Sequence, residues 1–331
     1  MKRIGPKLKR LLPAIQKNIL LKNYTTLKIG GPAKYFYVAK TKNELIKAIL
    51  TAKKFKLPFF ILGGGSNLLV SDKGFNGMVI KCQISNVKCQ TSRLYAEAGA
   101  PLFLLVNQST KQSLSGLEWA AGIPGTVGGA IRGNAGAFDG SMADVIKKVE
   151  VLDKKDLKIR KLNQKDCKFS YRDSVFKKNK DLVILSAESR LKKGNKREIQ
   201  KKMKEYLSYR KKTQPLNFSS AGSIFQNQKF HPHTKIWCGK QIKNQKLLKE
   251  FPRLKEFNTK GLVPAAYLIE KCGLKGKRMG GVKISEKHAN FIINLGKGQA
   301  KDVIRLINLV KKKVKKKFGV ELEEEIQRLG F

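Results

Sequence analysis

Two glycine-rich segments are the parts of this chain whose residues point most directly to chemistry. Residues 122–137, GIPGTVGGAIRGNAGA, hold six glycines and no run of strong helix formers. The second segment, residues 63–69 (GGGSNLL), follows the apolar run 59–62, which is typical of a strand that enters a turn. Glycine loops after strands expose backbone N–H groups that bind the oxygens of a diphosphate. Tight turns and close strand packing are the alternative use of such glycines.

The common phosphate-binding motifs are absent from both segments. Neither segment contains G-x-G-x-x-G, and no glycine of the chain is followed by Lys and then Ser or Thr, as a Walker loop requires. An ordinary dinucleotide-binding fold and a P-loop NTPase are therefore disfavoured. Because two glycine loops occur in one chain, we favour ligand binding over a purely structural use.

Three polar clusters could supply reactive groups beside such a ligand. They are residues 171–174 (YRDS), residues 219–225 (SSAGSIF) and residues 322–326 (LEEEI). Taken one at a time, each cluster has a structural alternative. These alternatives are, in the same order, a surface turn that holds an ion pair, the start of a strand and a solvated acidic face. Their chemistry therefore depends on which elements bring them together.

The pattern between residues 35 and 80 predicts a small βαβ-like lobe. Thr41 and Glu44 form a capping box in front of an apolar-periodic helix, and Pro58 precedes the strand 59–62. From about residue 87 to residue 191 short strands dominate around a helix, and we expect a second, sheet-rich lobe. The strands are predicted at 93–96, 145–152 and 182–186, and the helix near 102–112.

The remaining third of the chain begins with a charged helix over residues 197–212, which Pro215 follows. Residues 229–262 resemble a polar insertion with weak periodicity. A C-terminal helix is predicted because apolar residues recur there at helical spacing. Gly319 is expected to end this helix. These residues are Val303, Ile307, Val310 and Val314.

The composition is that of a globular protein with an extreme positive charge. The 331 residues, 41% of them hydrophobic, suffice for two or three domains with a core. The net charge of +46 makes binding to nucleic acid or to an anionic surface a competing hypothesis. However, only 13 of the 70 basic residues are arginine, the residue that specific nucleic-acid sites favour. We expect loose polyanion binding at low salt and no specific nucleic-acid partner.

The N-terminus is basic but lacks the apolar centre and the cleavage site of a secretory signal. No apolar stretch is long enough to span a bilayer. A short amphipathic helix that docks on the protein body is predicted instead. Its apolar face would consist of Leu11, Leu12, Ile15, Ile19 and Leu20.

The cysteines predict neither a disulfide framework nor a zinc ribbon. They are odd in number, and none forms a C-x-x-C pair, so a reducing cytoplasm is the expected location. His231, His233 and Cys238 lie close in sequence, but a fourth ligand at the usual spacing is missing. We therefore expect no metal site.

Ten segments, taken in order from about residue 20 to the end, resemble the motifs of one enzyme family. That family is UDP-N-acetylenolpyruvoylglucosamine reductase, also called UDP-N-acetylmuramate dehydrogenase, and the chain is similar to its shorter type. The segments are NYTTLKIGGPA from Asn23, ILGGGSNLLV, GLEWAAGIPGTVGGA, NAGA, CKFSYRDSVFK, RKKTQPL, SAGSIFQN, GLKG, HANFI and FGVELEEEI.

The resemblance implies an α+β fold with two parts. The first is a two-lobed FAD-binding domain of the vanillyl-alcohol oxidase type, and the second is a C-terminal α+β substrate domain. The boundaries that we predict are 1–20 for a basic N-terminal extension, 21–82 for the first FAD lobe, 83–212 for the second lobe, joined by 318–331, and 213–317 for the substrate domain, with the insertion near 229–262.

The resemblance also implies the cofactors. The family takes hydride from NADPH onto non-covalently bound FAD and passes it to the enolpyruvyl group of a UDP-sugar, which yields UDP-N-acetylmuramate, a peptidoglycan precursor. The glycine segments would hold the diphosphate and the flavin, in agreement with their backbone chemistry. The residues expected to bind FAD are Gly63, Gly64, Gly65, Ser66, Asn67, Leu68, Gly122, Ile123, Pro124, Gly125, Thr126, Gly128, Gly129, Asn134, Ala135 and Gly136.

Three residues match the catalytic positions of the family. Arg172 would stabilise the negative charge that hydride transfer places on the substrate carboxylate, because a guanidinium does not titrate near neutrality. Ser223 would donate the proton to the other carbon of the double bond. Glu325 would orient the substrate or share a stabilising hydrogen bond.

Contacts to the sugar nucleotide are expected from a further group of residues, because its diphosphate and carboxylate need cations or N–H donors. These residues are Arg210, Gln214, Asn227, Lys275 and His288. His288 is equally consistent with a structural role. The chain departs from the family pattern at Gln226 and Gln228, where a basic contact to the nucleotide is either lost or relocated, and at Glu324, which replaces proline.

We therefore predict a cytoplasmic, monomeric FAD-dependent enzyme that uses NADPH and a UDP-sugar. Two alternatives remain. One is a different flavin oxidoreductase with the same FAD domain, which another donor would reduce. The other is a basic polyanion-binding protein, which would be colourless and would bind nucleic acid with a steep dependence on salt.

Overall fold

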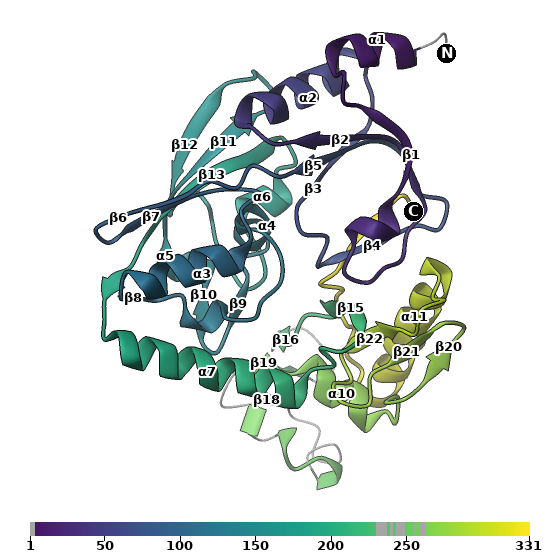
Figure 1. The fold of residues 1–331 in the computed structure, drawn as a ribbon. Coiled ribbons are helices and arrows are strands. Elements are labelled where there is room, and N and C mark those ends of the chain that lie inside the picture. Colours follow the sequence, from purple (N-terminus) through teal and green to yellow (C-terminus); the bar gives the residue numbers. More distant parts are fainter. Residues whose placement is uncertain (1–3, 230–236, 239–240, 243–248, 255, 258–261) are drawn as a thin grey trace. The chain divides into compact units, whose positions relative to one another are not determined.

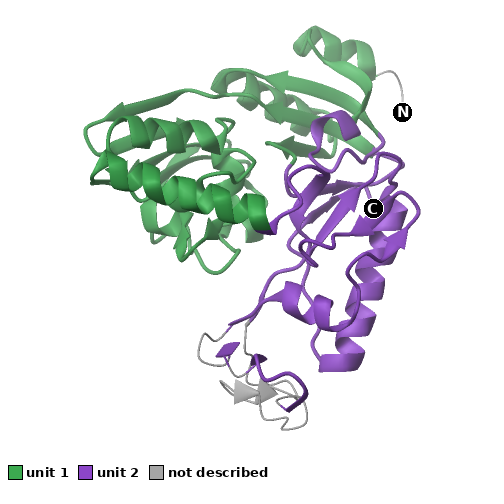
Figure 2. Cartoon of the chain, turned by 60° about the horizontal axis from the view of Figure 1, so that its bottom comes forward, with its two compact units in different colours: residues 1–20, 32–65, 75–212 green, residues 21–31, 66–74, 213–331 purple. Residues whose placement is uncertain are grey.

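The computed structural model describes residues 4–229, 237–238, 241–242, 249–254, 256–257 and 262–331 (Figure 1). The chain forms two compact units, and each consists of several stretches of sequence (Figure 2). Unit 1 contains Met1–Leu20, Pro32–Gly65 and Phe75–Lys212. Unit 2 contains Leu21–Gly31, Ser66–Gly74 and Thr213–Phe331. The predicted boundaries differ from this division because residues 21–31 and 66–74 belong to unit 2.

The first sheet of unit 1 has the strand order β1-β2-β5-β3. Strands β2 (Pro32–Ala39) and β3 (Phe59–Leu62) both pair in parallel with β5 (Phe75–Cys82). Helix α2 (Lys42–Lys54) connects β2 to β3 and buries its apolar face in the core of unit 1. The predicted N-cap is confirmed, because Oγ1 of Thr41 accepts from the N–H of Glu44 at 3.1 Å. The second bond of a capping box is displaced by one residue, since Oε2 of Glu44 accepts from the N–H of Lys40 at 2.7 Å.

The N-terminal helix was predicted in the wrong place, because, of its expected apolar face over residues 11–20, only Leu11 lies in a helix. Helix α1 (Ile4–Leu11) ends just before Pro13, and β1 (Gln16–Leu20) is a strand that pairs antiparallel with β2. The reason is that proline interrupts the helix and that the free edge of β2 offers hydrogen-bond partners, which local periodicity does not reveal. Leu8 of α1 is fully buried in the core of unit 1, so this earlier helix docks on the protein, and Leu12, which follows it, is buried in the same core.

The second sheet of unit 1 is antiparallel and follows the order β12-β11-β13-β7-β6. All three strands predicted in this region exist, as does the helix α3 (Leu102–Lys111). The strands are β6 (Val87–Gln90), β7 (Arg93–Glu97), β11 (Ile146–Asp153), β12 (Ile159–Asn163) and β13 (Leu182–Arg190). Their buried residues share one core with the first sheet.

Short elements and one long helix complete unit 1. The charged helix predicted over 197–212 is α7 (Lys196–Thr213). Within the second glycine segment the short helix α4 (Val127–Arg132) forms, which the sequence pattern did not predict. Its N-cap is Thr126, whose Oγ1 accepts from the N–H of Gly129 at 3.4 Å. The other short elements are β8 (Leu114–Ser115), η2 (Glu118–Ala120), β9 (Gly136–Ala137), β10 (Gly140–Ser141), α5 (Met142–Val145), α6 (Val175–Lys178) and β14 (Lys192–Lys193).

Unit 2 is built on a sheet of order β15-β22-β21-β20 and on helix α11 (Ala300–Phe318). The apolar face of α11 is buried, and Gly319 ends the helix with a φ of 65°, as predicted. The elements are η1 (Leu21–Tyr24), β4 (Leu68–Val70), β15 (Ser219–Ser223), β16 (Gln228–Lys229), β17 (Trp237–Cys238), β18 (Gln241–Ile242), β19 (Leu262–Val263), α10 (Ala265–Lys271), β20 (Arg278–Met279), β21 (Val282–Ile284), β22 (Phe291–Asn294) and β23 (Gln327–Leu329).

The C-terminal segment 318–331 was predicted to join the second FAD lobe. In the structure β23 pairs in parallel with β4, and both strands belong to unit 2. The pairing joins the end of the chain to the last two residues of the first glycine segment, Leu68 and Leu69, and to Val70. Such a pairing depends on backbone groups that are far apart in sequence, so no local pattern reports it.

Most of the predicted insertion 229–262 lies outside the described residues. Its described part reaches the core of unit 2 through Phe251, Leu254 and Phe257, which are all buried. The ring of Phe251 lies 5.2 Å from that of Phe318, and the ring of Phe257 lies 5.2 Å from that of Tyr267. Across the described part of the chain, no helix is long and apolar enough to cross a membrane.

Candidate functional site

The two glycine segments meet in unit 1, where backbone packs against backbone. A Cβ added at Gly64 would lie 2.7 Å from the Cα of Gly125, and a Cβ added at Gly63 would lie 2.6 Å from Oγ1 of Thr126. Real Cβ atoms essentially never come so close to other atoms. Close packing is therefore one reason for these glycines, and it is also what brings the two segments together.

The backbone of the second segment leaves donors available to a ligand. The N–H groups of Val127 and Gly128 donate to carbonyls of residues 98–100 at 2.9 and 2.8 Å. By contrast, among the described contacts of unit 1, the N–H groups of Gly122 and Gly125 donate to no other protein atom. Both glycines have φ values, 76° and 124°, that L side chains rarely adopt. A bare backbone with available N–H groups fits an anion such as the diphosphate of FAD.

Lys81 of β5 is a residue of this site that the sequence analysis did not single out. Its ammonium group donates to the carbonyl oxygen of Gly63, and burial lowers the pKa of this lysine. The bond holds the start of the first glycine segment at the end of β3. The sequence did contain a signal for this residue, because Lys81 is the one charged residue of the otherwise uncharged strand FNGMVIKC.

Arg172 lies in a tight turn with an uncommon backbone conformation. Ser170 and Asp173 exchange two backbone hydrogen bonds, at 3.0 and 3.1 Å, and Arg172 between them has a φ of 54°. Such a φ value is uncommon for residues other than glycine, and it occurs often at functional sites, where the backbone fixes the direction of a side chain. The guanidinium carbon of Arg172 lies 5.2 Å from the ring centroid of Tyr171.

The structure brings this turn and the second glycine segment together. Oγ of Ser174 donates to the carbonyl of Arg132 at 2.7 Å, and Nδ2 of Asn134 donates to the carbonyl of Ser170 at 2.8 Å. Oδ1 of Asn134 also accepts from the N–H of Ala143 at 3.0 Å. The side chain of Asn134, which was expected to bind FAD, therefore connects the second glycine segment to two other parts of the backbone, at Ser170 and at Ala143.

In unit 2 the segments around Ser223 and Glu325 lie side by side. The N–H of Glu325 donates to the carbonyl of Ile224 at 2.8 Å, and the N–H of Gln226 donates to the carbonyl of Glu323 at 2.9 Å. These segments are distant in sequence, and the structure makes them neighbours. Two of the three predicted catalytic residues therefore share one junction.

Asn67 adds the end of the first glycine segment to this junction. Its Nδ2 donates to the carbonyl of Glu325 at 3.0 Å, and its own carbonyl accepts from the N–H of Gln327 at 3.0 Å. Leu68, the next residue, begins β4, which pairs with β23. The first glycine segment is thus divided between the units, since Gly63–Gly65 belong to unit 1 and the following residues to unit 2.

The contacts of Glu324 distinguish it from Glu325. Oε1 of Glu324 lies 2.5 Å from Nζ of Lys311, and both carboxylate oxygens accept from Arg328, at 2.8 and 2.7 Å. Burial would raise the pKa of Glu324, but the hydrogen bonds and charges of Lys311 and Arg328 outweigh burial and lower it. Since Glu323 is exposed and Glu324 is held in ion pairs, the half-buried Glu325 is the better candidate for substrate chemistry.

Asn290 organises the same junction and was missed in the sequence analysis. It is buried, its Oδ1 accepts from the N–H of Phe225 at 3.0 Å, and its Nδ2 donates to the carbonyl of Phe225 at 2.8 Å. Its backbone carbonyl also accepts from the N–H of Ile224 at 2.8 Å. The signal was present in the HANFI motif, from which only His288 was selected.

The predicted substrate residues of unit 2 have different surroundings. Oδ1 of Asn227 accepts from the N–H of Ala265 at 3.2 Å, at the start of α10. Lys275 is exposed and pairs with Glu270 at 2.9 Å. Gln214 is half-buried just before β15. The structure does not gather these three side chains into one cluster by any contact among the described residues.

His288 is held within unit 2. Its Nδ1 accepts from the N–H of Asn290 at 3.3 Å, and its ring meets that of Phe291 edge-on at 4.8 Å. Burial lowers the pKa of His288, and the nearby charge of Lys275 lowers it further. These contacts agree with the structural role that the sequence analysis left open.

Arg210 is the one predicted substrate residue in unit 1. Only 8% of it is exposed, and its guanidinium binds backbone carbonyls, with Nε donating to Ala121 at 2.9 Å and Nη2 donating to Trp119 at 3.3 Å. Burial lowers its pKa. These carbonyls come immediately before the second glycine segment.

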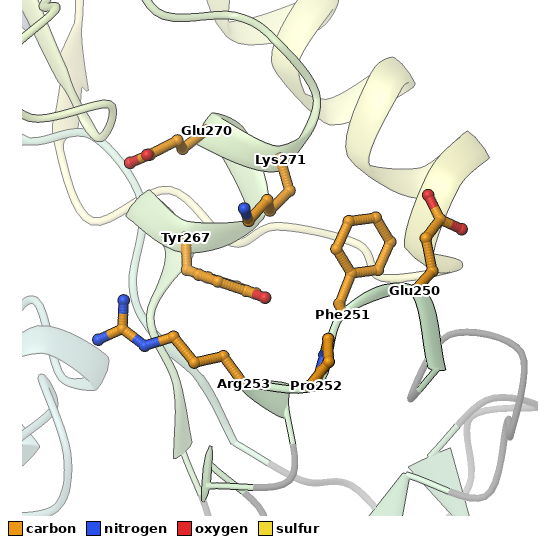
Figure 3. A pocket seen from close by; sticks show the side chains of 7 residues that line it. All are labelled: Glu250, Phe251, Pro252, Arg253, Tyr267, Glu270 and Lys271. Carbon is orange, nitrogen blue, oxygen red and sulfur yellow. The ribbon is translucent and has the colours of Figure 1, made fainter.

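Two hollows have linings that include none of the predicted site residues. One, in unit 2, has a volume of about 340 Å³, and the rings of Phe251 and Tyr267 face it (Figure 3). Its lining is Glu250, Phe251, Pro252, Arg253, Tyr267, Glu270 and Lys271. The other, of about 240 Å³, lies in unit 1 beside α7. It is lined by Gly116, Glu118, Trp119, Phe138, Asp139, Gly140, Asp144, Lys202 and Tyr206.

His231 and His233, which were considered as metal ligands, lie outside the described residues. Within the described ranges, no three or more His, Cys, Asp and Glu side chains are grouped so that they could hold a metal ion.

Comparison with known proteins identifies both parts of the chain. Residues 33–163 match the family "FAD binding domain", and residues 214–329 match the family "UDP-N-acetylenolpyruvoylglucosamine reductase, C-terminal domain". The α+β fold, with an FAD-binding domain followed by this C-terminal domain, is thereby confirmed.

Curated relatives match over nearly their whole length. UDP-N-acetylenolpyruvoylglucosamine reductase of Caldanaerobacter subterraneus subsp. tengcongensis is 42% identical, over 98% of this chain and 97% of its own. The protein of the same name from Clostridium novyi is 38% identical, over 99% of this chain and 96% of its own.

A solved structure agrees with these relatives. The crystal structure of UDP-N-acetylenolpyruvylglucosamine reductase from Thermus caldophilus matches with a TM-score of 0.73 and 33% identity, over 95% of this chain and 99% of that one. Together with the glycine segments of unit 1 and the junction of unit 2, these matches show that the chain belongs to the UDP-N-acetylenolpyruvoylglucosamine reductase family, whose members are FAD-dependent oxidoreductases.

Proposed function

We propose that this chain reduces UDP-N-acetylenolpyruvoylglucosamine to UDP-N-acetylmuramate with NADPH, in the synthesis of peptidoglycan precursors. The observation that carries the proposal is the 42% identity over 98% of the chain to a reductase of this name. The junction of Ser223 and Glu325 supports it, because this junction pairs a hydroxyl-bearing and a carboxylate-bearing segment of backbone.

FAD is the cofactor of the family and, when bound, supplies hydride storage between the two substrates. The paired glycine segments of unit 1 would hold its diphosphate without a covalent bond, through a bare backbone and the N–H groups of Gly122 and Gly125. Lys81 would keep the first segment in place through its bond to Gly63. We retain the proposal that residues 21–82 and 83–212 serve FAD and that residues 213–317 serve the UDP-sugar.

Arg172 would stabilise charge on the substrate. When hydride reaches the vinyl carbon, negative charge grows on the adjacent carboxylate, where a fixed cation lowers the barrier. Removing one preorganised donor of this kind typically costs about 3 to 4 kcal/mol. The constrained turn at Arg172 supports this role, since the strained backbone and the anchors at Ser174 and Asn134 fix where the side chain begins.

Ser223 would give the proton that completes the reduction, and Glu325 would orient the substrate beside it. A hydroxyl is a weak acid in water, so it needs neighbours that stabilise its conjugate base or relay a proton. The choice of Glu325 over Glu324 rests on the ion pairs of Glu324 with Lys311 and Arg328.

The experiment that tests this proposal separates the two half-reactions by stopped-flow absorbance under anaerobic conditions. The purified protein should be yellow, should bleach with NADPH and should turn yellow again when the enolpyruvyl sugar nucleotide is added. In Ser223→Ala, bleaching should keep nearly its normal rate, whereas the return of colour should slow by about 10²- to 10⁴-fold.

A matched control is Ser220→Ala in the same strand, β15, which should leave both rates nearly unchanged. Equal losses in both half-reactions of Ser223→Ala would contradict the proposed role of this serine. A colourless protein that binds neither FAD nor NADPH would remove the proposal as a whole.

We further propose that the protein acts as a cytoplasmic monomer. A nucleotide-sugar substrate, NADPH and the cysteine usage described above support this location. Light scattering after size-exclusion chromatography checks the oligomeric state, and a mass of twice 37.2 kDa would exclude the monomer.

A further inference from the structure

Helix α7 is unusually polar for a helix that attaches to a domain. Of its residues only Ile199 and Arg210 are buried. Together with the half-buried Met203 and Tyr206 they form a stripe at i, i+4, i+7 and i+11, which is the spacing of one helix face. The contacts made by this stripe therefore decide where the helix lies on unit 1.

Arg210 binds the backbone directly before the second glycine segment. Its donors reach the carbonyls of Ala121 and Trp119, at 2.9 and 3.3 Å, and the guanidinium is almost completely removed from water. A buried guanidinium is retained where its fixed fork of donors has acceptors in matching positions. Here the acceptors are backbone carbonyls, so the bonds define the path of the chain.

Gly122 is packed against the same helix. A Cβ at this position would lie 2.8 Å from Cδ2 of Leu207 and 3.2 Å from Cδ of Arg210. With a φ of 76°, Gly122 also has a conformation that favours glycine. The first residue of the glycine segment thus lies directly against α7.

Phe138, the residue directly after the segment, contacts α7 through an aromatic stack. The ring of Phe138 lies 4.1 Å from that of Tyr206, nearly parallel at 10°, and its centroid is 5.2 Å from the guanidinium carbon of Arg210. Phe138 and Asp139 have φ values of 49° and 61°. Aspartate tolerates such a value, but it is costly for the bulky Phe138. The stack on Tyr206 offsets this cost and holds the hairpin β9–β10 in place.

We propose that Arg210 is a positioning residue for the FAD-binding glycine segment and not a ligand of the sugar nucleotide. With Tyr206 it fixes both ends of residues 122–137, so that the bare backbone between them is preorganised for the diphosphate of FAD. The inference rests on the proposed function, because it takes this segment as part of the FAD site.

The test compares FAD affinity with substrate KM in Arg210→Met, which keeps the length of the side chain but removes its donors. We expect the Kd for FAD to rise by about 10- to 100-fold, as misplaced binding groups typically cause. At saturating FAD, the KM for the enolpyruvyl sugar nucleotide should stay within about twofold of the original value. Arg210→Lys should recover only part of the FAD affinity, since one ammonium cannot replace a fork of donors.

Two further variants sharpen the test. Lys204→Met removes a positive charge from the exposed face of the same helix and should leave both constants unchanged. Tyr206→Leu should weaken FAD binding without changing the KM of the substrate, because it acts on the other end of the segment.

The opposite result in Arg210→Met, a normal Kd for FAD with a raised KM for the sugar nucleotide, would overturn the inference and restore Arg210 as a substrate ligand. Unchanged values of both constants would overturn it too. An original protein that binds no FAD would instead remove the proposed function, so the two failures are distinguishable. Urea unfolding of the apoprotein verifies that Arg210→Met is folded at the temperature of the assay.

Discussion

The junction of the glycine segments in unit 1 and the junction of Ser223 with Glu325 in unit 2 are held in different ways. In unit 1, Gly64 meets the backbone of Gly125 so closely that an added Cβ would lie 2.7 Å from its Cα. In unit 2, the buried Asn290 satisfies both the N–H and the carbonyl of Phe225. The first junction depends on glycines that have no side chain, and the second depends on the side-chain amide of Asn290.

This difference teaches what each region tolerates. The glycine junction should be sensitive to any added methyl group, because backbone atoms cannot move aside as a flexible side chain can. The serine–glutamate junction should tolerate changes of volume better than the loss of a hydrogen-bonding group, because a buried backbone group without a partner costs free energy. Substitutions of opposite kinds therefore test the two regions.

The largest effect is expected from Gly64→Ala. The new Cβ would overlap Gly125, so the two segments must separate, and we expect the free energy of unfolding of unit 1 to fall by about 3 kcal/mol. FAD affinity should fall with it. Urea unfolding and FAD titration measure the two quantities. A variant of normal stability would show that the contact between the segments is looser than the structure describes.

Asn290→Ala should give the next largest effect. The substitution leaves the N–H and the carbonyl of Phe225 without their side-chain partners, which we expect to cost about 2 kcal/mol of stability. Because Phe225 lies two residues after Ser223, the reoxidation of the flavin by substrate should also slow. Asn290→Asp, which keeps the acceptor but loses the donor, is the matched control and should retain part of the stability. An Asn290→Ala protein as stable as the original would show that water replaces the amide.

Gly129→Ala separates packing from ligand binding in unit 1. Its Cβ would meet only Oγ1 of Thr126, at an ordinary 3.5 Å, and alanine favours the helix α4, so the apoprotein should gain about 0.5 to 1 kcal/mol. If Gly129 faces FAD, as proposed, the affinity for FAD should fall while stability rises. Equal FAD affinity in both proteins would take Gly129 out of the cofactor site. This variant is the counterpart of Gly64→Ala, in which both quantities fall.

The smallest effect concerns His288 and pH. Burial lowers the pKa of His288 in the folded protein below its ordinary value of 6.5, and Lys275 lowers it further. Below pH 6.5 the unfolded chain therefore binds a proton that the folded chain does not bind, and stability is lost as the pH falls through the lowered pKa. Above pH 6.5 both states are neutral at this residue, and its contribution is fully present.

The measurement compares urea midpoints at pH 7.5 and pH 5.5 for the original protein and for His288→Gln. The original protein should lose more stability between these values than the variant, which has no imidazole to titrate. The same loss in both proteins would mean that other groups cause the pH dependence.

Much of the fold could be predicted from local patterns. The N-cap at Thr41, the helix α7 and the stop of α11 at Gly319 follow from interactions between residues within a few positions of one another. The N-terminal prediction failed because the structure of residues 16–20 is decided by a distant partner. These residues pair with the edge of β2, although their own apolar spacing favours a helix. The short helix α4 was not predicted because its glycines oppose helix formation and only the cap at Thr126 favours it.

The sequence by itself determined the family, the cofactor and the residue types available for chemistry, because glycine spacing and the order of motifs can be identified without knowledge of the fold. Tertiary structure decided which of these residues meet. Asn67 and Glu325 are 258 positions apart and share a hydrogen bond, and the guanidinium of Arg210 donates to the carbonyls of Trp119 and Ala121, about 90 positions away. The physical reason is that local propensities act along the chain, whereas hydrogen bonds and steric exclusion act between any groups that folding brings into contact.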